Sequence, residues 1–314
     1  MSPSTPDSTP GSTPAHTPQL LTDGERPAVL VTRRLDHPAE RVWEAITVPG
    51  LLAQWFPSEA DFELRPGGTV TFDPDGEAYD GQVLTAEPPH RLEFTWEADR
   101  LEFTLAGAGD GRTTDLTLVH AFDDLAGAAS FATGWEGCLA GLADVLAGRE
   151  PADPGRRVAR HEELVALFGL DRPEVTRSED GTWRAVWERQ LTCPAQVAWD
   201  LWFGTDRDTG RQRKAPDVGA PFRPSGAPGT VLGTARVVQE PRRFVLGIAA
   251  DVAGETLGFR LGDGTGHGAR IYLEVTGRDE DLDEALELWG EGALGGLARA
   301  AAEQDAASRD AAGH

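Results

Sequence analysis

Apolar and polar residues alternate through residues 79–122 with the period of two that is typical of β-strands with one covered face. The clearest example is Arg91–Ala98, where large apolar residues occupy every second position and Glu or Thr stands between them. Tyr79–Ala86 precedes it, and Arg100–Leu105 and Thr114–Phe122 follow, with short turns between the segments. Serial strands joined by short turns predict an antiparallel meander that is apolar on one side.

Helical patterns stand on both sides of this meander. Ala39, Val42, Trp43 and Ile46 follow the i, i+3, i+4, i+7 spacing of one helix face, and Pro38 suits the first helical position. A much longer helical pattern runs from Phe131 to Leu146. A helix of that length laid over the sheet predicts an α+β helix-grip domain.

The second half of the chain repeats the first. Arg33 to Trp43 recurs as Arg189 to Trp199 at an offset of 156 positions, with Arg, Leu, Pro, Ala and Trp at matching places. The Pro89 corner recurs at Pro241, and the Glu136–Ala143 stretch of the long helix recurs 155 positions later. Three blocks in the same order predict a tandem duplication with a diverged second copy.

These patterns divide the chain into five segments. Residues 1–26 are rich in Pro, Ser and Thr and poor in large apolar side chains, so we expect a disordered tail. We expect the first domain at residues 27–150, a linker with a short helix at 151–180, the second domain at 181–303, and a C-terminal tail at 304–314.

Composition excludes several functions. The formal net charge of −23 argues against binding to nucleic acid or to an anionic membrane surface. Cys138 and Cys193 are 55 positions apart and predict neither a zinc site nor a disulfide framework, and we expect no metal and no cofactor. The chain has no apolar run of 18 residues and no signal sequence, so we expect a cytoplasmic protein.

The first half resembles a known family over about Pro27–Glu150. The stretches that carry the resemblance are VWEAIT, LLAQWF, RPGGTV, GQVLTAEPPHRLEFTW, TTDLTLVHAF and GWEGCLAGLADVL. They are similar to the Aha1-type (activator of Hsp90 ATPase homologue-like) branch of the START/Bet v 1-like, or SRPBCC, superfamily. The resemblance implies the same helix-grip fold that the alternation predicts.

His120 is the one polar residue on the predicted covered face of the first sheet. It is either a core histidine hydrogen-bonded to a neighbour or a pocket group that anchors a ligand. Aromatic residues would line the same space, with Trp55 at the mouth. The candidate ligand-binding residues are Trp55, Tyr79, Trp96, Phe103, His120 and Trp135.

Glycines interrupt both long helices, where each interior glycine costs about 1 kcal/mol relative to alanine. Such glycines are expected where a helix backbone closely approaches the sheet or borders a hollow. The glycines concerned are Gly134, Gly137 and Gly141 in the first helix, and Gly290, Gly292, Gly295 and Gly296 in the second.

A cationic loop, Asp206–Pro221, replaces the LLAQWF turn in the second copy. It is either a solvated loop or an interaction surface for an anionic protein partner. Its cations are Arg207, Arg211, Arg213 and Lys214.

Three functions follow as hypotheses. The first is a non-catalytic module that binds a small hydrophobic ligand in the first domain, with the degenerate second copy as an interaction surface. The second is an enzyme like the polyketide cyclases and aromatases of the superfamily, with His120 and Tyr79 as acid/base groups. The third, an Hsp90 co-chaperone, is suggested by the family resemblance alone. No catalytic residue is predicted, because the sequence shows no nucleophile motif.

Overall fold

The computed structural model describes residues 17–73, 77–107, 109, 111–153, 155, 157–205, 209–266 and 268–312, with backbone only from 305 onwards. The chain divides into two compact units, Met1–Gly155 and Arg156–His314, which are described separately below. The short helix predicted in the linker begins at Val158, so it belongs to the second unit.

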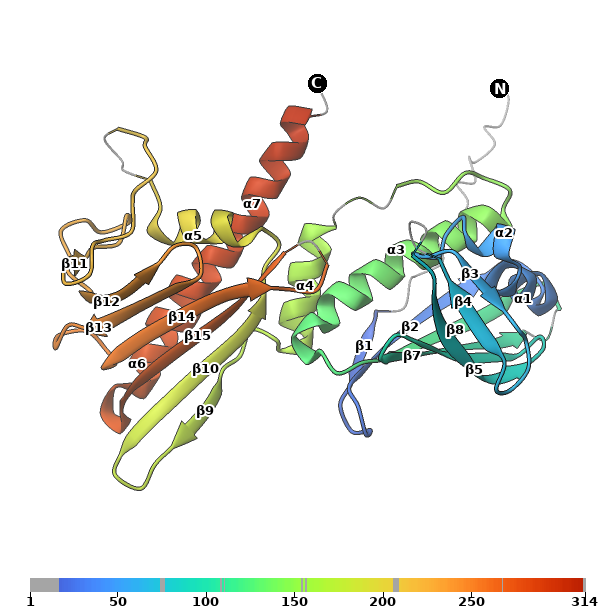
Figure 1. Ribbon diagram of the computed structural model, residues 1–314, viewed down its shortest axis with the longest axis horizontal. Helices are drawn as coiled ribbons and strands as arrows, with labels where there is room; N and C mark the ends of the chain where they lie inside the picture. The colour runs from blue at the N-terminus through green and yellow to red at the C-terminus, as the bar shows by residue number, and fades with distance from the viewer. Residues whose placement is uncertain are drawn as a thin grey trace, which may run out of the picture. The chain divides into compact units, whose positions relative to one another are not determined.

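The first domain is an antiparallel sheet with two short helices and one long helix (Figure 1). Its elements are β1 (Gln19–Leu21), β2 (Ala28–Leu35), α1 (Ala39–Thr47), α2 (Pro49–Leu52), β3 (Ala60–Phe62), β4 (Thr69–Phe72), β5 (Tyr79–Glu87), β6 (Arg91–Trp96), β7 (Asp99–Gly107), β8 (Thr114–Ala121), η1 (Leu125–Gly127) and α3 (Ala128–Leu146).

The eight strands follow the order β1-β2-β8-β7-β6-β5-β4-β3, and each pair is antiparallel. The predicted meander is confirmed, because β5, β6, β7 and β8 are neighbours in chain order. The long helix α3 packs on β2 and α1, and its buried face includes Trp135, Leu139 and Leu142. Pro38 is the N-cap of α1 rather than its first residue.

The second domain has the same kinds of element in the same order, preceded by a helix of its own (Figure 1). Its elements are α4 (Val158–Phe168), β9 (Glu174–Arg177), β10 (Thr182–Gln190), α5 (Ala195–Phe203), β11 (Pro221–Phe222), β12 (Gly233–Gln239), β13 (Arg243–Ile248), β14 (Thr256–Asp263), β15 (Ala269–Arg278), η2 (Asp279–Asp281), α6 (Leu282–Ala285), the π-helical η3 (Leu286–Leu294) and α7 (Gly295–Ala312).

The second sheet has the order β11-β12-β13-β14-β15-β10-β9. Read from the other end, this is the order of the first sheet without a counterpart of β3, with β10 in the place of β2 and β15 in the place of β8. Both domains are therefore helix grips, as the sequence predicts. The shared topology supports the prediction that the second is a diverged copy of the first.

The two long helices differ in regularity. Whereas α3 is one continuous α-helix, its counterpart passes through nine π-helical residues before α7 begins. A π-turn widens the backbone spiral, and such segments occur often at functional sites. The interruption coincides with Gly290 and Gly292, two of the helix glycines noted in the sequence.

Parts of both predicted tails have regular secondary structure. Gln19–Leu21 form β1 and pair with Ala28–Leu30 of β2, so the segment predicted to be disordered contains an ordered strand at its C-terminal end. Residues 1–16 lie outside the described part of the chain. At the other end, α7 continues to Ala312, so most of the predicted C-terminal tail is helical.

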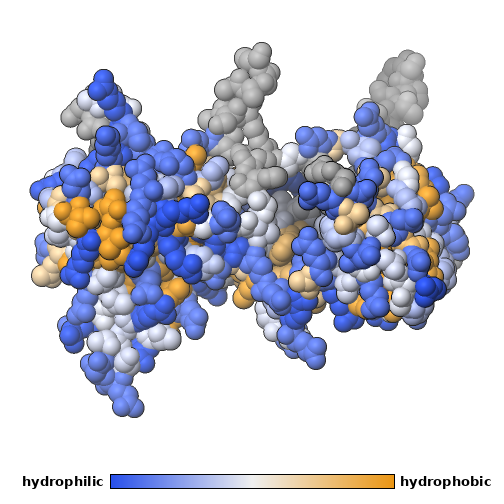
Figure 2. All heavy atoms as spheres, viewed as in Figure 1, coloured by the Kyte–Doolittle hydropathy of each residue, from blue (hydrophilic) through white to orange (hydrophobic). Residues whose placement is uncertain are grey.

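Hydrophilic residues dominate the face drawn in Figure 2, and smaller apolar patches lie among them. This agrees with the large excess of acidic over basic residues. Within the described residues, every helix is too short or too polar to cross a lipid bilayer.

Candidate functional site

The structure brings the six predicted ligand-binding residues together between the first sheet and α3. Trp55 follows α2, and its ring packs edge-on against Phe103 of β7, with 6.2 Å between the ring centroids. Trp96 of β6 makes a similar contact with Trp135 of α3, also at 6.2 Å. The Trp96 indole N–H donates a hydrogen bond to the Tyr79 hydroxyl. Their role in ligand binding stays a prediction.

Phe56 connects this array, although it is not among the six predicted residues. Its ring lies 5.3 Å from Trp96, 5.7 Å from Trp135 and 5.7 Å from Trp55. The sequence shows Phe56 only as the second member of an apolar pair after a short helix. Its central position depends on how α2 returns the chain to the sheet.

Trp55 was expected at the mouth of a pocket, and the structure places it elsewhere. Its side chain is buried, and its indole N–H donates to the carbonyl oxygen of Ala45 at 3.0 Å. Tyr79 and Trp96 are only partly buried. The accessible edge of the aromatic array is therefore at these two residues, next to the stacked ring of Phe72.

Both ring nitrogens of His120 form hydrogen bonds within the protein. The Trp135 indole N–H donates to Nδ1 at 3.0 Å, so Nδ1 is the acceptor. Nε2 must then carry the proton, and it lies 2.9 Å from Oδ2 of Asp99. With 2% of its surface exposed, His120 has the geometry of a satisfied core histidine and has no ring nitrogen left for a ligand.

Asp99 is the partner that sequence analysis missed. It stands at the start of β7, directly across the β6–β7 turn from Trp96. Arg26 reaches the same carboxylate at 3.4 Å and also binds Asp123 at 2.7 Å. The chain of contacts runs from Trp135 through His120 and Asp99 to Arg26, and it joins the buried interior to the surface.

The described residues show neither an activated thiol at Cys138 nor a cluster of metal ligands. Burial raises the pKa of the Cys138 thiol on α3 to about 11, so this thiol is protonated at neutral pH. Among the residues that the structure describes, no cluster of His, Cys, Asp and Glu side chains has the arrangement of a metal site.

A hollow of about 610 Å³ lies in the second domain between α4, β10 and the long helix. Its apolar wall includes Trp187, Leu286 and Pro173, and the glycines Gly290 and Gly295 lie along the helix side. A Cβ atom on Gly290 would meet the Trp187 ring at 2.7 Å. In the second helix, Gly290 thus permits close approach to the sheet, and Gly290 and Gly295 border a hollow.

Buried charged groups lie at one side of this hollow. The Arg189 guanidinium binds Oε2 of Glu162 at 2.5 Å, and Nδ1 of His161 lies 3.3 Å from Oε1 of the same carboxylate. Burial acts to raise the pKa of Glu162, but the hydrogen bond from His161 and the charge of Arg189 outweigh it, so this pKa lies below its ordinary value. Arg189 Nε and His161 Nε2 are buried and have no hydrogen-bond partner among the described residues.

Comparison with known proteins agrees with this fold. Residues 36–147 match the family model described as "Activator of Hsp90 ATPase homolog 1-like protein". The first domain is an Aha1-type SRPBCC domain. The family model does not extend into the second domain. None of the curated proteins matches the chain.

Several solved structures are similar to part of the chain. EF2215 from Enterococcus faecalis, a conserved protein of unknown function, is 18% identical, with a TM-score of 0.42, over 48% of this chain and 91% of its own. CalU16 from Micromonospora echinospora is 28% identical, with a TM-score of 0.38, over 48% of this chain and 94% of its own. MLL2253 from Mesorhizobium loti is 28% identical, with a TM-score of 0.35, over 38% of this chain and 97% of its own.

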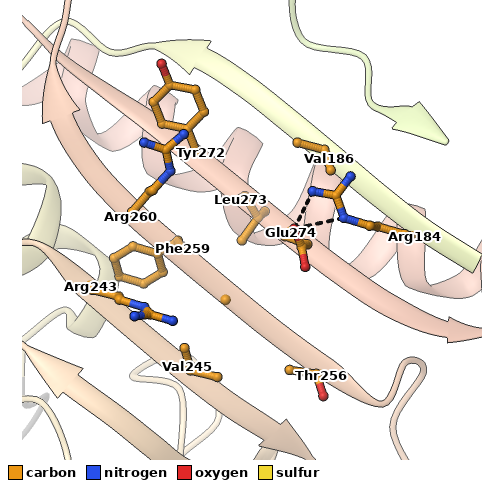
Figure 3. Close-up of a pocket in the computed structure, with 11 residues that line it drawn as sticks. Arg184, Val186, Arg243, Val245, Thr256, Phe259, Arg260, Tyr272, Leu273 and Glu274 are labelled. Carbon is orange, nitrogen blue, oxygen red and sulfur yellow. Dashed lines mark hydrogen bonds and ion pairs between the residues drawn. The ribbon is translucent and has the colours of Figure 1, made fainter. Parts of the chain in front are cut away.

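A second hollow, of about 370 Å³, lies on the outer face of the second sheet (Figure 3). Gly258 is among the residues that line it. Arg184, Arg243 and Arg260 reach it from three different strands. Arg184 is bound to Glu274 at 2.5 Å, and the Arg260 guanidinium stacks over the Tyr272 ring at 3.6 Å.

The cationic loop of the second domain is described in part. Arg211, Arg213 and Lys214 are present, and a bridge between Thr205 and Gln212 closes the base of the loop. Arg207 lies outside the described residues. A role for these cations in partner binding stays a prediction.

Proposed function

We propose that this protein is a non-catalytic binding protein for a small, largely apolar ligand. The observation that carries the proposal is the hollow of about 610 Å³ beside the interrupted long helix of the second domain. This volume is within the range of small-molecule sites, which combine apolar walls with a few polar groups. Trp187, Leu286 and Pro173 supply the walls here, and Arg189 supplies buried polar character.

This proposal places the ligand in the copy that the sequence suggested was degenerate. The aromatic array of the first domain is the other candidate position, with its accessible edge at Tyr79 and Trp96. Ring contacts of 5–6 Å fill much of that interior with protein side chains. A ligand there would contact the accessible edge, whereas the second domain offers a formed hollow.

Hydrogen bonding favours binding over cyclase-type catalysis. A general acid or base must reach the substrate with an available proton or lone pair. His120 uses Nδ1 for Trp135 and Nε2 for Asp99, and Tyr79 accepts from Trp96. The histidine of the cyclase hypothesis thus has no ring nitrogen left for a substrate.

A titration of the full chain with the neutral fluorophore N-phenyl-1-naphthylamine tests the proposal. Gly295→Leu places an apolar side chain in the hollow, where a Cβ would meet its nearest neighbours at 3.4–3.5 Å and would fit. We expect this variant to weaken probe binding by about tenfold or more, since it fills the space that the ligand needs. Gly292→Leu adds the same side chain to an exposed position of the same helix and should bind like the wild type.

The same titration separates the two candidate positions. If Trp96→Ala weakens binding while Gly295→Leu does not, the ligand site is the aromatic array of the first domain. If the full chain takes up no apolar probe at all, the binding proposal is wrong.

The matched family model favours one further candidate, an Hsp90 co-chaperone, through its description alone. A pull-down with the chaperone would distinguish it. A stoichiometric complex would support this function, whereas recovery of neither protein with the other would exclude it.

A further inference from the structure

The outer faces of the two sheets carry different charges at equivalent ladder positions. In the first domain Arg91 pairs with Glu93 at 3.3 Å and with Glu102 at 2.9 Å, and Arg100 forms an ion pair with Glu93 as well. Two arginines and two glutamates on β6 and β7 therefore neutralise one another. Glu93 is almost completely buried within this network.

The second copy keeps arginine and loses both glutamates. In the first domain Arg91 is opposite Thr104, and Glu93 is opposite Glu102. At the corresponding places of β13 and β14, Arg243 is opposite Arg260, and Val245 is opposite Gly258. Each carboxylate is thus replaced by an uncharged residue. Thr256 stands in the place of Arg100 and Arg260 in the place of Thr104, so two arginines remain without the two carboxylates.

This replacement leaves both space and uncompensated charge. Like charges directly opposite each other on neighbouring strands are destabilising. Arg243 and Arg260 are both exposed, and neither forms an ion pair with a carboxylate among the residues that the structure describes. Gly258 has no side chain to fill the position of Glu102, and the hollow of about 370 Å³ includes this position.

The surroundings of the hollow suit a carboxylate on a short apolar stem. Val186 and Val245 give it apolar sides, and the Tyr272 ring holds Arg260 in place (Figure 3). Desolvation and a hydrogen bond with the Glu188 carboxylate raise the pKa of Tyr272, so its hydroxyl stays protonated. Arginine's planar guanidinium is well suited to binding carboxylates.

We propose that this hollow docks an acidic peptide segment of a partner protein, with a Glu or Asp side chain entering beside Arg243 and Arg260. The partner's carboxylate then takes the place that Glu93 and Glu102 fill within the first domain. Because the whole chain carries a net charge of −23, attraction acts only locally. At physiological salt, charges beyond about 8 Å are largely screened, so the segment must reach the hollow itself. This inference does not depend on the ligand-binding function.

Fluorescence anisotropy with the full chain tests it, using the fluorescein-labelled peptide Gly-Glu-Val-Glu-Val-Glu-Gly. We expect the double variant Arg243→Ala/Arg260→Ala to bind at least about tenfold more weakly, because two charge-assisted contacts are lost. Arg34→Ala/Arg41→Ala changes the net charge equally at exposed sites of the first domain and should change binding less than about twofold.

A second variant restores the first domain's charge pattern. Gly258→Glu supplies an internal carboxylate, and a Cβ there would meet its nearest neighbours at 3.6–3.8 Å, so it fits without a clash. It should weaken peptide binding about tenfold without lowering the melting temperature, because it relieves the repulsion between the two arginines.

Three results would overturn the proposal. One is unchanged binding by both hollow variants, and another is an equal loss in the control double variant. The third is displacement of the peptide by an equimolar amount of inorganic phosphate, which would identify a site for small anions instead of a docking surface. None of these results bears on uptake of the apolar probe, so the two proposals fail separately.

Discussion

At one equivalent position the two helix grips take an aromatic ring from opposite sides of the interior. In the first domain Trp135 projects from the helix and binds His120 on the sheet. In the second, Val275 stands in the place of His120, and Gly290 stands in the place of Trp135. The ring that fills this space is Trp187, which comes from the strand β10 and packs against Gly290.

The two domains also differ in how their buried polar groups are satisfied. The first interior satisfies His120 with two hydrogen bonds. In the second domain Arg189 Nε, His161 Nε2 and Trp202 Nε1 are buried without partners among the described residues. Of these three residues, Arg189 lines the hollow. An unsatisfied buried group costs stability, and it is retained more readily where a site needs it. The comparison teaches that one topology can support a closed interior and an open one.

The largest expected effect is on the stability of the second domain. Trp187→Ala removes the ring that holds the helix against the sheet and should destabilise the second domain by about 3–5 kcal/mol. Calorimetry of the full chain should show one transition lowered in temperature while the other is unchanged. A uniform shift of both transitions would contradict the separate interiors described above.

The next largest effect on stability is expected when His120 is replaced by valine, the residue that stands at the equivalent position of the second domain. His120→Val removes both hydrogen bonds and leaves the buried Trp135 N–H unpaired, at a cost of about 2–3 kcal/mol. Adding Trp135→Phe removes the unpaired donor. In denaturant unfolding, the double variant should therefore be less destabilised than the sum of the two single variants. Strict additivity would mean that the Trp135–His120 contact contributes nothing.

The ion pair between Glu162 and Arg189 should make the stability of the second domain depend on pH. Since the pKa of Glu162 is lowered below 4.5 by folding, its stabilisation is fully present above pH 4.5 and is lost as the pH falls through the folded-state value. Glu162→Gln should cost about 1–2 kcal/mol at neutral pH, and this cost should shrink towards about pH 3. Urea unfolding at both pH values measures the difference, and a cost independent of pH would show that the charge of Glu162 is irrelevant.

The smallest effect compares glycines of the two long helices. A Cβ on Gly134 of α3 would meet nothing within 4 Å, so Gly134→Ala should stabilise the first domain by about 0.5–1 kcal/mol. Gly290→Ala should instead destabilise the second domain, because its Cβ would meet the Trp187 ring at 2.7 Å. Thermal melts that shift in the same direction for both variants would contradict the close packing at Gly290.

Much of the fold could be predicted because its signals are local. Period-two alternation identifies β6 and β8 almost to the residue, and helical spacing identifies α1 and α3. The strand β1 was missed because its three residues adjoin a tail of low apolar content, and only pairing with β2 makes them a strand. Four of the six predicted site residues lie on strands, where alternation fixes the face of each side chain, and helical spacing fixes the face of Trp135.

The contacts and burial of individual residues in the candidate site could not be predicted in the same way. Asp99 was overlooked because it is the first residue of β7, at the edge of the turn after Trp96, and nothing local indicates that His120 is close to it. The burial of Trp55 follows from α2, which carries the chain back under the sheet.

The sequence by itself determined that this chain folds twice into a strand meander covered by a long helix, because periodicity and turn chemistry act between near neighbours. Only the tertiary structure decided which copy has a hollow beside its helix, how His120 is bonded, and that Arg243 faces Arg260. These features arise where residues far apart in the chain meet across ladders and between layers, and a single side chain such as Gly258 or Gly290 then changes the space available to all its neighbours.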